Sequence, residues 1–573
     1  MRAIPSARRA LPLFLIGALA ACAAPEAADL VLTNGKIVTV DASLPEAEAV
    51  AIQGDRIVAV GSSADIEAFV GGATEVIDLQ GRLAIPGFIE GHGHYVGLGQ
   101  SKMILDLTQV TSWQEIVDMV AEAARTAPPG EWIRGRGWHQ EKWTSVPADA
   151  VDGVPLHTTL SAVSPENPVI LGHASGHAAF ANRMAFDMAG IDAQTPDPPG
   201  GTIVRDVAGK ATGLLRENAD ALVYGVMDEE MDGRSEGERW EEFVRQVELA
   251  GEEALSKGVT TFHDAGSSFQ TIEGLRRLAD EGRLPVRLYV MVRGESNESM
   301  DARLPEHRMI GYANGFLTVR SIKRQIDGAL GSHGAWLLEP YADMPGSAGL
   351  TVEDPEDIAE TARIAAAHGF QLNTHAIGDR ANRVVLDIYE HTFAERDDGQ
   401  ELRWRIEHAQ HVHPDDIPRF AELGVIAAMQ GVHATSDAPW VYERLGAQRA
   451  ASGAYVWRSF MDAGVTVTNG TDTPVEDVSP VASFYSSVVR QDNQGNDFFP
   501  SQRMSRMEAL ESYTINNAYA AFEEDVKGSI TPGKLADITV LDRDIMTVPE
   551  PEIASARVEM TIVGGEIRYS AGS

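Results

Sequence analysis

Hydrophobic and β-branched residues at both ends of the chain occur in short runs that are separated by turn residues. The runs are residues 29–40, 49–60, 75–83, 537–542 and 558–569. Asn34-Gly35 and Gly54-Asp55 interrupt the first two runs at their centres, so each of these runs predicts a β-hairpin. Because the two ends share this pattern, we predict that residues 30–84 and 522–573 pair into one small β-sandwich.

In residues 85–521 the pattern changes to buried strands that alternate with amphipathic helices. Helical periodicity covers residues 271–281, 355–368 and 380–395. The strand-like runs are residues 85–94, 259–264, 286–292, 317–323, 371–375, 404–408, 425–429 and 465–472. Eight strand–helix units predict an α/β fold with a closed parallel (β/α)8 barrel of the TIM type. Alternation without closure would instead give an open sheet.

One long insertion breaks the regular spacing of the strands. About 160 residues separate the first barrel strand from the second, and they include a long helical pattern at residues 237–257. We interpret residues 100–250, approximately, as an inserted lid subdomain that lies over the mouth of the barrel. The alternative is a separate domain that has no connection with the functional site.

The N-terminus has the features of an export signal. Three arginines precede an apolar run at residues 11–21, which is followed by Cys22, the only cysteine in the chain. This pattern predicts a signal peptide over residues 1–21. It resembles a bacterial lipoprotein signal, which implies that Cys22 becomes a lipidated N-terminus and that residues 22–29 form a tether. The resemblance also implies that the protein is anchored to a bacterial membrane, expected to be the outer one, and faces the periplasm. A plain signal peptide, and hence a soluble periplasmic protein, is the alternative.

The charge of the chain restricts its partners. The 573 residues exceed one compact core, so two or more domains are expected. The formal net charge of −37 argues against nucleic acid, because phosphate binding needs basic patches. The same negative charge also argues against binding to a broad surface of anionic lipids. A solvated acidic surface explains the charge, and an acidic field that attracts cationic substrates is the alternative.

The candidate chemistry begins at His92 and His94. On an extended strand residues i and i+2 face the same side, so both imidazoles can reach one metal ion. Catalytic residues of such barrels lie where the strands end. The ends of the predicted strands carry His92, His94, Lys323, His375, His408 and Asp472. Four imidazoles and a carboxylate fit Zn²⁺ or a similar first-row divalent ion.

Several motifs resemble the amidohydrolase superfamily, and most closely its YtcJ-like branch, which includes N-substituted formamide deformylases. The motifs are residues 86–94 (PGFIEGHGH), 327–332 (DGALGS), 375–379 (HAIGD), 407–408 (EH), 472–475 (DTPV) and 528–537 (GSITPGKLAD). The resemblance covers nearly the whole mature chain. It implies a metal-dependent hydrolase on a barrel, with a β-sandwich built from both chain ends.

The resemblance also implies a centre with two divalent metal ions, expected to be zinc. The implied ligands are His92, His94 and Asp472 for one ion, and His375 and His408 for the other. Lys323 would be carboxylated on its amine and bridge the ions, because a plain ammonium group has no lone pair to offer a cation. The alternative is an ion pair of Lys323 with Asp327, which would leave an enzyme with one metal ion.

The implied reaction is hydrolysis of a C–N bond in a small-molecule substrate. A bound ion lowers the pKa of water, and Asp472 would act as ligand and as catalytic base. A lactone or cyclic-amide hydrolase and a deaminase use the same ligands and remain alternatives. A binding lipoprotein on an inactive barrel is the rival from another class, and it predicts that ligands are lost. A homodimer is a further possibility.

Five residues are candidates for substrate binding. They are His139, His177, Glu217, His333 and Trp336. His177 and Glu217 match recurring positions of the branch, whereas His139 and His333 stand where relatives often carry Asp and Arg. Trp138 and Trp143 could line an apolar pocket, although tryptophans more often belong to the core.

Overall fold

The computed structural model describes residues 26–145, 149–151 and 153–572. The predicted signal peptide and Cys22 therefore lie outside the described residues. Within the described part of the chain, no helix is both long enough and apolar enough to cross a membrane.

A parallel barrel forms the centre of the molecule, as predicted. Its strands are β8 (Phe88–Gly93), β15 (Val259–Ser267), β16 (Arg287–Val292), β18 (Leu317–Gln325), β19 (Gln371–Ala376), β20 (Arg405–His408), β21 (Ile426–Gln430) and β22 (Val467–Gly470). They are hydrogen-bonded in this order and all neighbouring pairs are parallel. Each of the eight strand-like runs in the sequence contributes one strand.

The barrel is nearly closed, because its first and last strands, β8 and β22, are not hydrogen-bonded to each other as strands, and a side chain bridges them. The amide of Asn517, on α19 (Ile515–Ala520), donates to the carbonyl of Ile89 at 2.7 Å and to that of Asn469 at 2.9 Å. A Cβ atom on Gly91 would lie only 2.3 Å from the Asn469 carbonyl, so glycine permits this close approach. The backbone N–H of Asp472 then donates to the carbonyl of His92 at 2.7 Å, which joins the ends of the two strands.

Helices cover the outside of the barrel and begin at conventional caps. The helices α8 (Phe269–Asp280), α11 (Pro355–His368) and α12 (Asp379–Ala394) match the three predicted helical segments to within two residues. The Asp354 carboxylate caps α11, which has proline in its first turn and ends at Gly369 with φ 68°. These helices bury their apolar faces against the strands and fix the mouth of the barrel.

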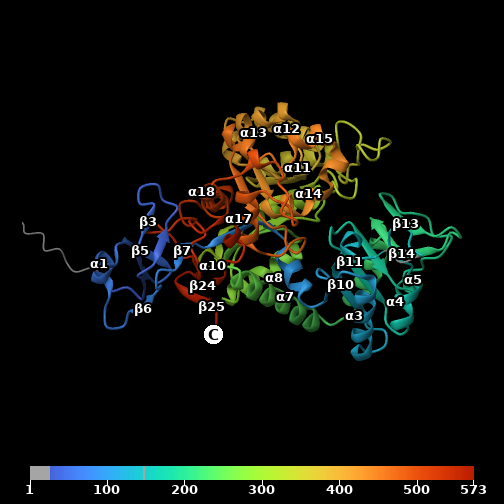
Figure 1. Cartoon of the computed structure of the whole chain (residues 1–573), viewed down its shortest axis with the longest axis horizontal. Helices are drawn as coiled ribbons and strands as arrows, with labels where there is room; N and C mark the ends of the chain where they lie inside the picture. The colour runs from blue at the N-terminus through green and yellow to red at the C-terminus, as the bar shows by residue number, and fades with distance from the viewer. Residues whose placement is uncertain (1–25, 146–148, 152, 573) are drawn as a thin grey trace, which may run out of the picture.

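Strands from both chain ends share one sheet beside the barrel. The order of this sheet is β25 (Glu566–Ser570), β24 (Val558–Val563), β23 (Ile538–Leu541), β7 (Leu83–Pro86), β2 (Lys36–Val38) and β3 (Glu46–Ala47). A second sheet has the order β5 (Arg56–Gly61), β4 (Ala49–Gln53), β1 (Leu30–Thr33) and β6 (Glu75–Asp78). The two sheets enclose a common apolar cluster. In Figure 1 the N-terminal strands lie at the left, against the red C-terminal strands.

One of the two predicted hairpins is confirmed and the other is wrong. β4 and β5 pair antiparallel, with Gln53 opposite Arg56 across the turn. β1 and β2 do not pair, because β1 has β4 and β6 as its neighbours and β2 has β3 and β7. The Asn34-Gly35 turn instead carries the chain from one sheet to the other, and it packs beneath Leu79. The alternation of hydrophobic and polar residues is the same whether two successive strands pair with each other or with other strands, so it cannot identify the partner of a strand.

The insertion between β8 and β15 forms a third sheet. Its order is β13 (Gly201–Arg205), β14 (Ala211–Glu217), β12 (Ala178–Ala181), β11 (Val169–His173), β10 (Ile133–Trp138) and β9 (Leu105–Asp106). Figure 1 shows this subdomain in blue-green at the right of the barrel, opposite the terminal sheets. Trp138 and Trp143 belong to its hydrophobic core, and Trp138 donates its indole N–H to the Leu171 carbonyl at 2.8 Å. Both side chains therefore stabilise the interior of the inserted subdomain.

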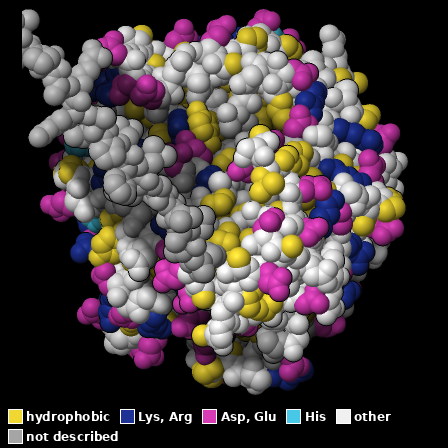
Figure 2. All heavy atoms as spheres, turned by 90° about the vertical axis from the view of Figure 1, so that its left-hand side faces the viewer, with side chains coloured by type: hydrophobic (Ala, Val, Ile, Leu, Met, Phe, Trp, Pro, Cys, Tyr) yellow, Lys and Arg dark blue, Asp and Glu magenta, His cyan; other side chains and the backbone are white. Residues whose placement is uncertain are grey.

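Acidic side chains are distributed over the surface. Figure 2 shows them spread across the face that carries the N-terminal strands, interspersed with Lys and Arg side chains. This distribution agrees with a solvated acidic surface as the explanation of the net charge of −37.

Candidate metal centre

Three of the predicted ligands meet where the last barrel strand joins the first. His92 and His94 lie at the end of β8, and Asp472 follows β22 with φ 57°. The Oδ1 atom of Asp472 lies 3.3 Å from His94 Nε2 and 3.6 Å from His92 Nε2. One ligand atom from each residue falls within 4.8 Å of the other two, which is a separation that a single ion can bridge.

Lys323 extends from β18 into the same space. Its Nζ atom lies 3.2 Å from His92 Nε2, and burial lowers its pKa to about 8. The ion pair with Asp327 is not found. Asp327 instead accepts the backbone N–H groups of Ile377 at 3.0 Å and of Gly378 at 2.8 Å. Because its pKa is lowered, Lys323 loses its proton more readily than an exposed lysine. The neutral amine then does not repel a cation that is bound at the site.

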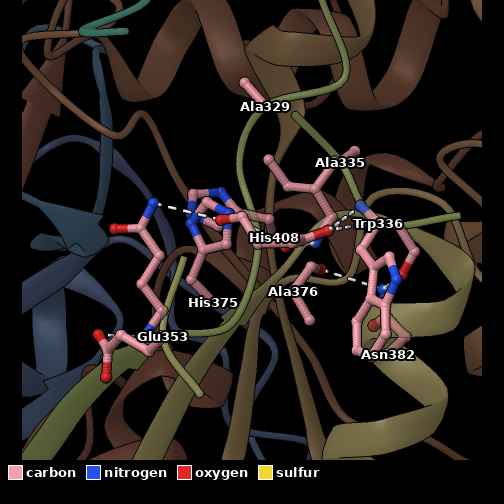
Figure 3. Close-up of polar contacts among 12 residues, drawn as sticks. Ala329, Ala335, Trp336, Glu353, His375, Ala376, Asn382 and His408 are labelled. Carbon is pink, nitrogen blue, oxygen red and sulfur yellow. Dashed lines mark hydrogen bonds and ion pairs between the residues drawn. The ribbon is translucent and has the colours of Figure 1, made fainter. Parts of the chain in front are cut away.

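The remaining two histidines complete the cluster. The rings of His375 and His408 are 4.4 Å apart between centroids, and the rings of His92 and His408 are 4.7 Å apart. His408 Nδ1 contacts the Gln430 side-chain oxygen at 2.7 Å, which leaves Nε2 to face the site. His375 Nε2 makes no hydrogen bond within the described part of the chain, although Asp327 Oδ1 lies 3.5 Å from it. Figure 3 shows both rings side by side at the ends of their strands.

The protonation states fit a divalent cation. Burial, assisted by the charge of Lys323, lowers the pKa of His92 to about 4. Burial also holds the pKa of His375 and of His408 well below the usual range. Burial opposes ionisation of Asp472, but His94 and His92 outweigh it and keep the pKa of this carboxyl well below its usual range. The cluster therefore offers neutral imidazoles and a carboxylate, which are the donors that such ions take.

A carboxylate behind His92 was not identified from the sequence. Glu407 Oε2 contacts His92 Nδ1, and Glu407 Oε1 lies 3.1 Å from Arg405 Nε. This contact fixes the ring so that Nε2 points to Lys323 and Asp472. Metal-binding histidines commonly present their second nitrogen to a carboxylate in this way. The only sequence signal was the position of Glu407 next to His408 at a strand end.

Asp327 organises the loop that carries Trp336. Its carboxylate accepts the Trp336 backbone N–H at 2.8 Å in addition to those of Ile377 and Gly378. A Cβ atom on Gly378 would lie 2.1 Å from the Trp336 carbonyl, so the two segments are in close contact. Figure 3 shows Trp336 beside this junction, next to the end of β19. Trp336 is thus held against the segment that follows β19.

The lid contributes a paired histidine and glutamate. His177 Nδ1 contacts Glu217 Oε2 at 2.9 Å, and the backbone N–H of Glu217 donates to the His177 carbonyl at 2.9 Å. Burial alone would lower the pKa of His177, but the hydrogen bond and charge of Glu217, together with Asp472, raise it. The pair therefore holds a histidine of raised pKa on the inserted subdomain.

Two other predicted substrate residues make their contacts elsewhere. The His139 ring lies 4.5 Å from the ring of His173 within the lid, and burial lowers its pKa to about 4. His333 Nε2 lies 3.0 Å from Asp343 Oδ2, and its ring packs against Tyr341. Their roles in substrate binding stay predictions.

Comparisons with known proteins agree with this geometry. A model of the amidohydrolase family matches residues 75–569. The chain is 36% identical to the Arabidopsis thaliana protein LONG AFTER FAR-RED 3, over 95% of this chain and 92% of that protein. It is 29% identical to the putative amidohydrolase YtcJ of Bacillus subtilis, over 87% of this chain and 90% of that protein.

Two further likenesses concern an enzyme and a solved structure. The chain is 29% identical to the N-substituted formamide deformylase of Arthrobacter pascens, over 94% of this chain and 98% of that enzyme. The crystal structure of an uncharacterized metal-dependent hydrolase from Pyrococcus horikoshii superposes with a TM-score of 0.73 at 26% identity, and the match covers 91% of this chain and 99% of that one.

Proposed function

This chain belongs to the amidohydrolase family, and on that premise we propose that it hydrolyses a C–N bond in an amide, N-formyl or N-acyl compound of small or medium size. The convergence of His92, His94, His375, His408, Asp472 and Lys323 carries this proposal. The deformylase at 29% identity supports the choice of a C–N bond.

The proposed cofactor is a pair of divalent ions, in particular zinc. The residues that would hold them are His92, His94 and Asp472 for one ion and His375 and His408 for the other, with carboxylated Lys323 between. When bound, such ions supply water of lowered pKa and polarise a carbonyl group. The lowered pKa of Lys323, about 8, supports carboxylation because the reaction with CO₂ requires the neutral amine.

The side chains of this protein then handle the proton and the substrate. Asp472 would accept the proton of the attacking water and deliver it to the departing nitrogen. Glu217 accepts the Nδ1–H of His177 and raises the pKa of this histidine, so in its protonated form His177 also has an Nε2–H with which to orient the substrate. Glu407 and Gln430 fix the imidazoles of His92 and His408, so the ligand atoms need little reorganisation during the reaction.

A substrate screen tests the proposal. The metal-loaded protein is assayed against matched N-formyl, N-acyl, lactone and amidine compounds, with Asp472→Asn as the inactive control. Release of an amine from the first two classes by the wild type alone is the expected result. Preferential turnover of lactones or amidines would replace the C–N assignment by a lactonase or deaminase. Turnover of no class by fully loaded protein would favour a binding protein.

For localisation we propose that the protein is exported and attached to the bacterial membrane through lipidated Cys22. The support for this proposal is the sequence pattern of residues 1–22 alone.

A further inference from the structure

A cavity of about 380 Å³ lies between the lid sheet, α6 (Ala221–Asp232) and α2 (Tyr95–Ser101). Gly172 forms part of the wall on the sheet side, and Asp220 and Tyr224 form part of the opposite wall. A cavity of this size falls in the range of small-molecule sites. None of the proposed metal ligands lines it, so it is a separate compartment of the molecule.

Arg136 connects this cavity with the metal centre. Arg136 lines the cavity, and its guanidinium group donates from Nη1 to the carbonyl of Pro474 and from Nη2 to the carbonyl of Ala174 at 3.3 Å. Pro474 lies two residues after Asp472. Gly176, another residue of the wall, immediately precedes His177. A substrate held at the metal centre would therefore have this compartment next to it.

The wall carries charges of both signs, since Arg134, Arg136, Asp220 and Asp228 all line the cavity. Arg136 is engaged by two carbonyl groups, and Arg134 lies 3.4 Å from Glu242. Asp220 makes no ion pair within 4.0 Å among the residues that the structure describes. Burial and the charge of Glu217 raise the pKa of Asp220 to about 6, which leaves it ionised above neutral pH. The charge of His177 opposes this rise in the pKa of Asp220, but His177 is already paired with Glu217.

We propose that this cavity binds a cationic arm of the substrate, such as an alkylammonium group, with Asp220 as the counter-ion and the ring of Tyr224 as an aromatic wall. The Asp220 carboxylate has a backbone hydrogen bond from Ala221 but no ion pair. A partly buried carboxylate without an ion pair gains from a ligand that brings the opposite charge. The face of a tyrosine ring also attracts cations. The proposal rests on the proposed hydrolase function and specifies its substrate class.

Three formamides with similar chains and different ends test it. They are N-formyl-diaminopentane with an ammonium end, N-formyl-hexylamine with a methyl end, and N-formyl-aminohexanoate with a carboxylate end. Binding to the full metal-loaded protein is measured by titration calorimetry, and turnover is recorded separately. The ammonium compound should bind about tenfold or more tightly than the methyl compound, which is the scale of one hydrogen bond to a charged group. The carboxylate compound should bind most weakly.

Two variants and a matched control make the test specific. Asp220→Asn should abolish the preference for the ammonium end, whereas Glu229→Gln, at an exposed position of α6, should retain it. Gly172→Leu should fill the cavity and weaken all three long compounds, but leave N-methylformamide unaffected. A Cβ atom at Gly172 would meet Tyr224 Oη at 3.4 Å and Arg136 Cγ at 3.5 Å, which are ordinary contacts, so we expect this variant to fold.

The possible outcomes separate this proposal from the proposed function. Equal binding of the ammonium and methyl compounds, or an intact preference in folded Asp220→Asn, would overturn the cationic-arm assignment. If Asp220→Asn does not fold, Gly172→Leu decides, and unchanged binding in that variant overturns the proposal. A preference for the ammonium end without hydrolysis of any formamide supports the cavity assignment and contradicts C–N hydrolysis.

Discussion

Glu407 on β20 contacts His92 Nδ1 on β8 across the interior of the barrel, and Arg405 holds the other oxygen of the same carboxylate at 3.1 Å. Burial opposes ionisation of Glu407, but Arg405 and His92 outweigh it and hold the pKa of this carboxyl well below its usual range. The carboxylate therefore stays charged and keeps the proton of His92 on Nδ1, which leaves Nε2 as a lone-pair donor.

Glu407→Gln should weaken metal binding without removing a ligand. The amide can still contact His92, but it no longer fixes the tautomer, so metal affinity should fall by about 10–100-fold. Competition with a chelator of known affinity measures the effect. Glu401→Gln, at an exposed position, should leave the affinity unchanged. Equal affinity of wild type and Glu407→Gln would show that the carboxylate has no influence on the metal centre.

The metal content tests the role of Lys323. Elemental analysis of the purified protein should give close to two divalent ions per chain, and Lys323→Ala should lose most of the activity together with at least one ion. Lys323→Glu should retain more metal than Lys323→Ala, because its carboxylate imitates part of a carbamate. Full activity after exhaustive chelation, with no transition metal left, would contradict the mechanism.

Asp472→Asn should reduce turnover by at least about 10²-fold, the scale of lost general-base catalysis. The substitution keeps the shape of the side chain and preserves the backbone N–H that donates to the His92 carbonyl, so the thermal unfolding temperature should change little. Steady-state kinetics and a melting curve on the same preparation provide the two measurements. Turnover near the wild-type value would exclude Asp472 as the proton carrier.

The pH profile tests the lid pair. Glu217 raises the pKa of His177, so loss of its charge should lower that pKa. Because a protonated His177 is lost as pH rises, the alkaline limb of kcat/KM in Glu217→Gln should move to lower pH. Glu229→Gln is the matched control, since this residue is exposed on α6. An unmoved alkaline limb in Glu217→Gln would limit the pair to a structural role in the lid.

The proposed attachment to the membrane requires Cys22. Lipidated protein should fractionate with membranes, because each buried CH₂ group of an acyl chain contributes about 0.8 kcal/mol. Cys22→Ala should take up no radioactive palmitate and should appear in the soluble fraction, with the activity of the barrel intact. Equal label in both proteins would leave a soluble periplasmic enzyme as the better interpretation.

The fold was predicted correctly from the sequence where a pattern is compatible with only one structure. Short buried runs between turns became barrel strands, and their ends brought His92, Lys323 and Asp472 together, because parallel strands in a barrel end on one face. The Asn34-Gly35 turn was misread because a strand pattern does not reveal the partner of a strand. Asn517 and Glu407 were missed because their partners are far away in sequence and only the closed barrel brings them into contact.

The junction of β8 and β22 also determines when the protein can fold during synthesis. His92 is synthesised early. The barrel can close only after the chain has been made as far as Asn517. Strand β7 gains its second neighbour only after β23 has been made. Until then the edges of β8 and β7 remain open to other strands, which favours aggregation. The nascent chain therefore needs protection for most of its translation, and a chain that is held unfolded for export would receive that protection before it begins to fold.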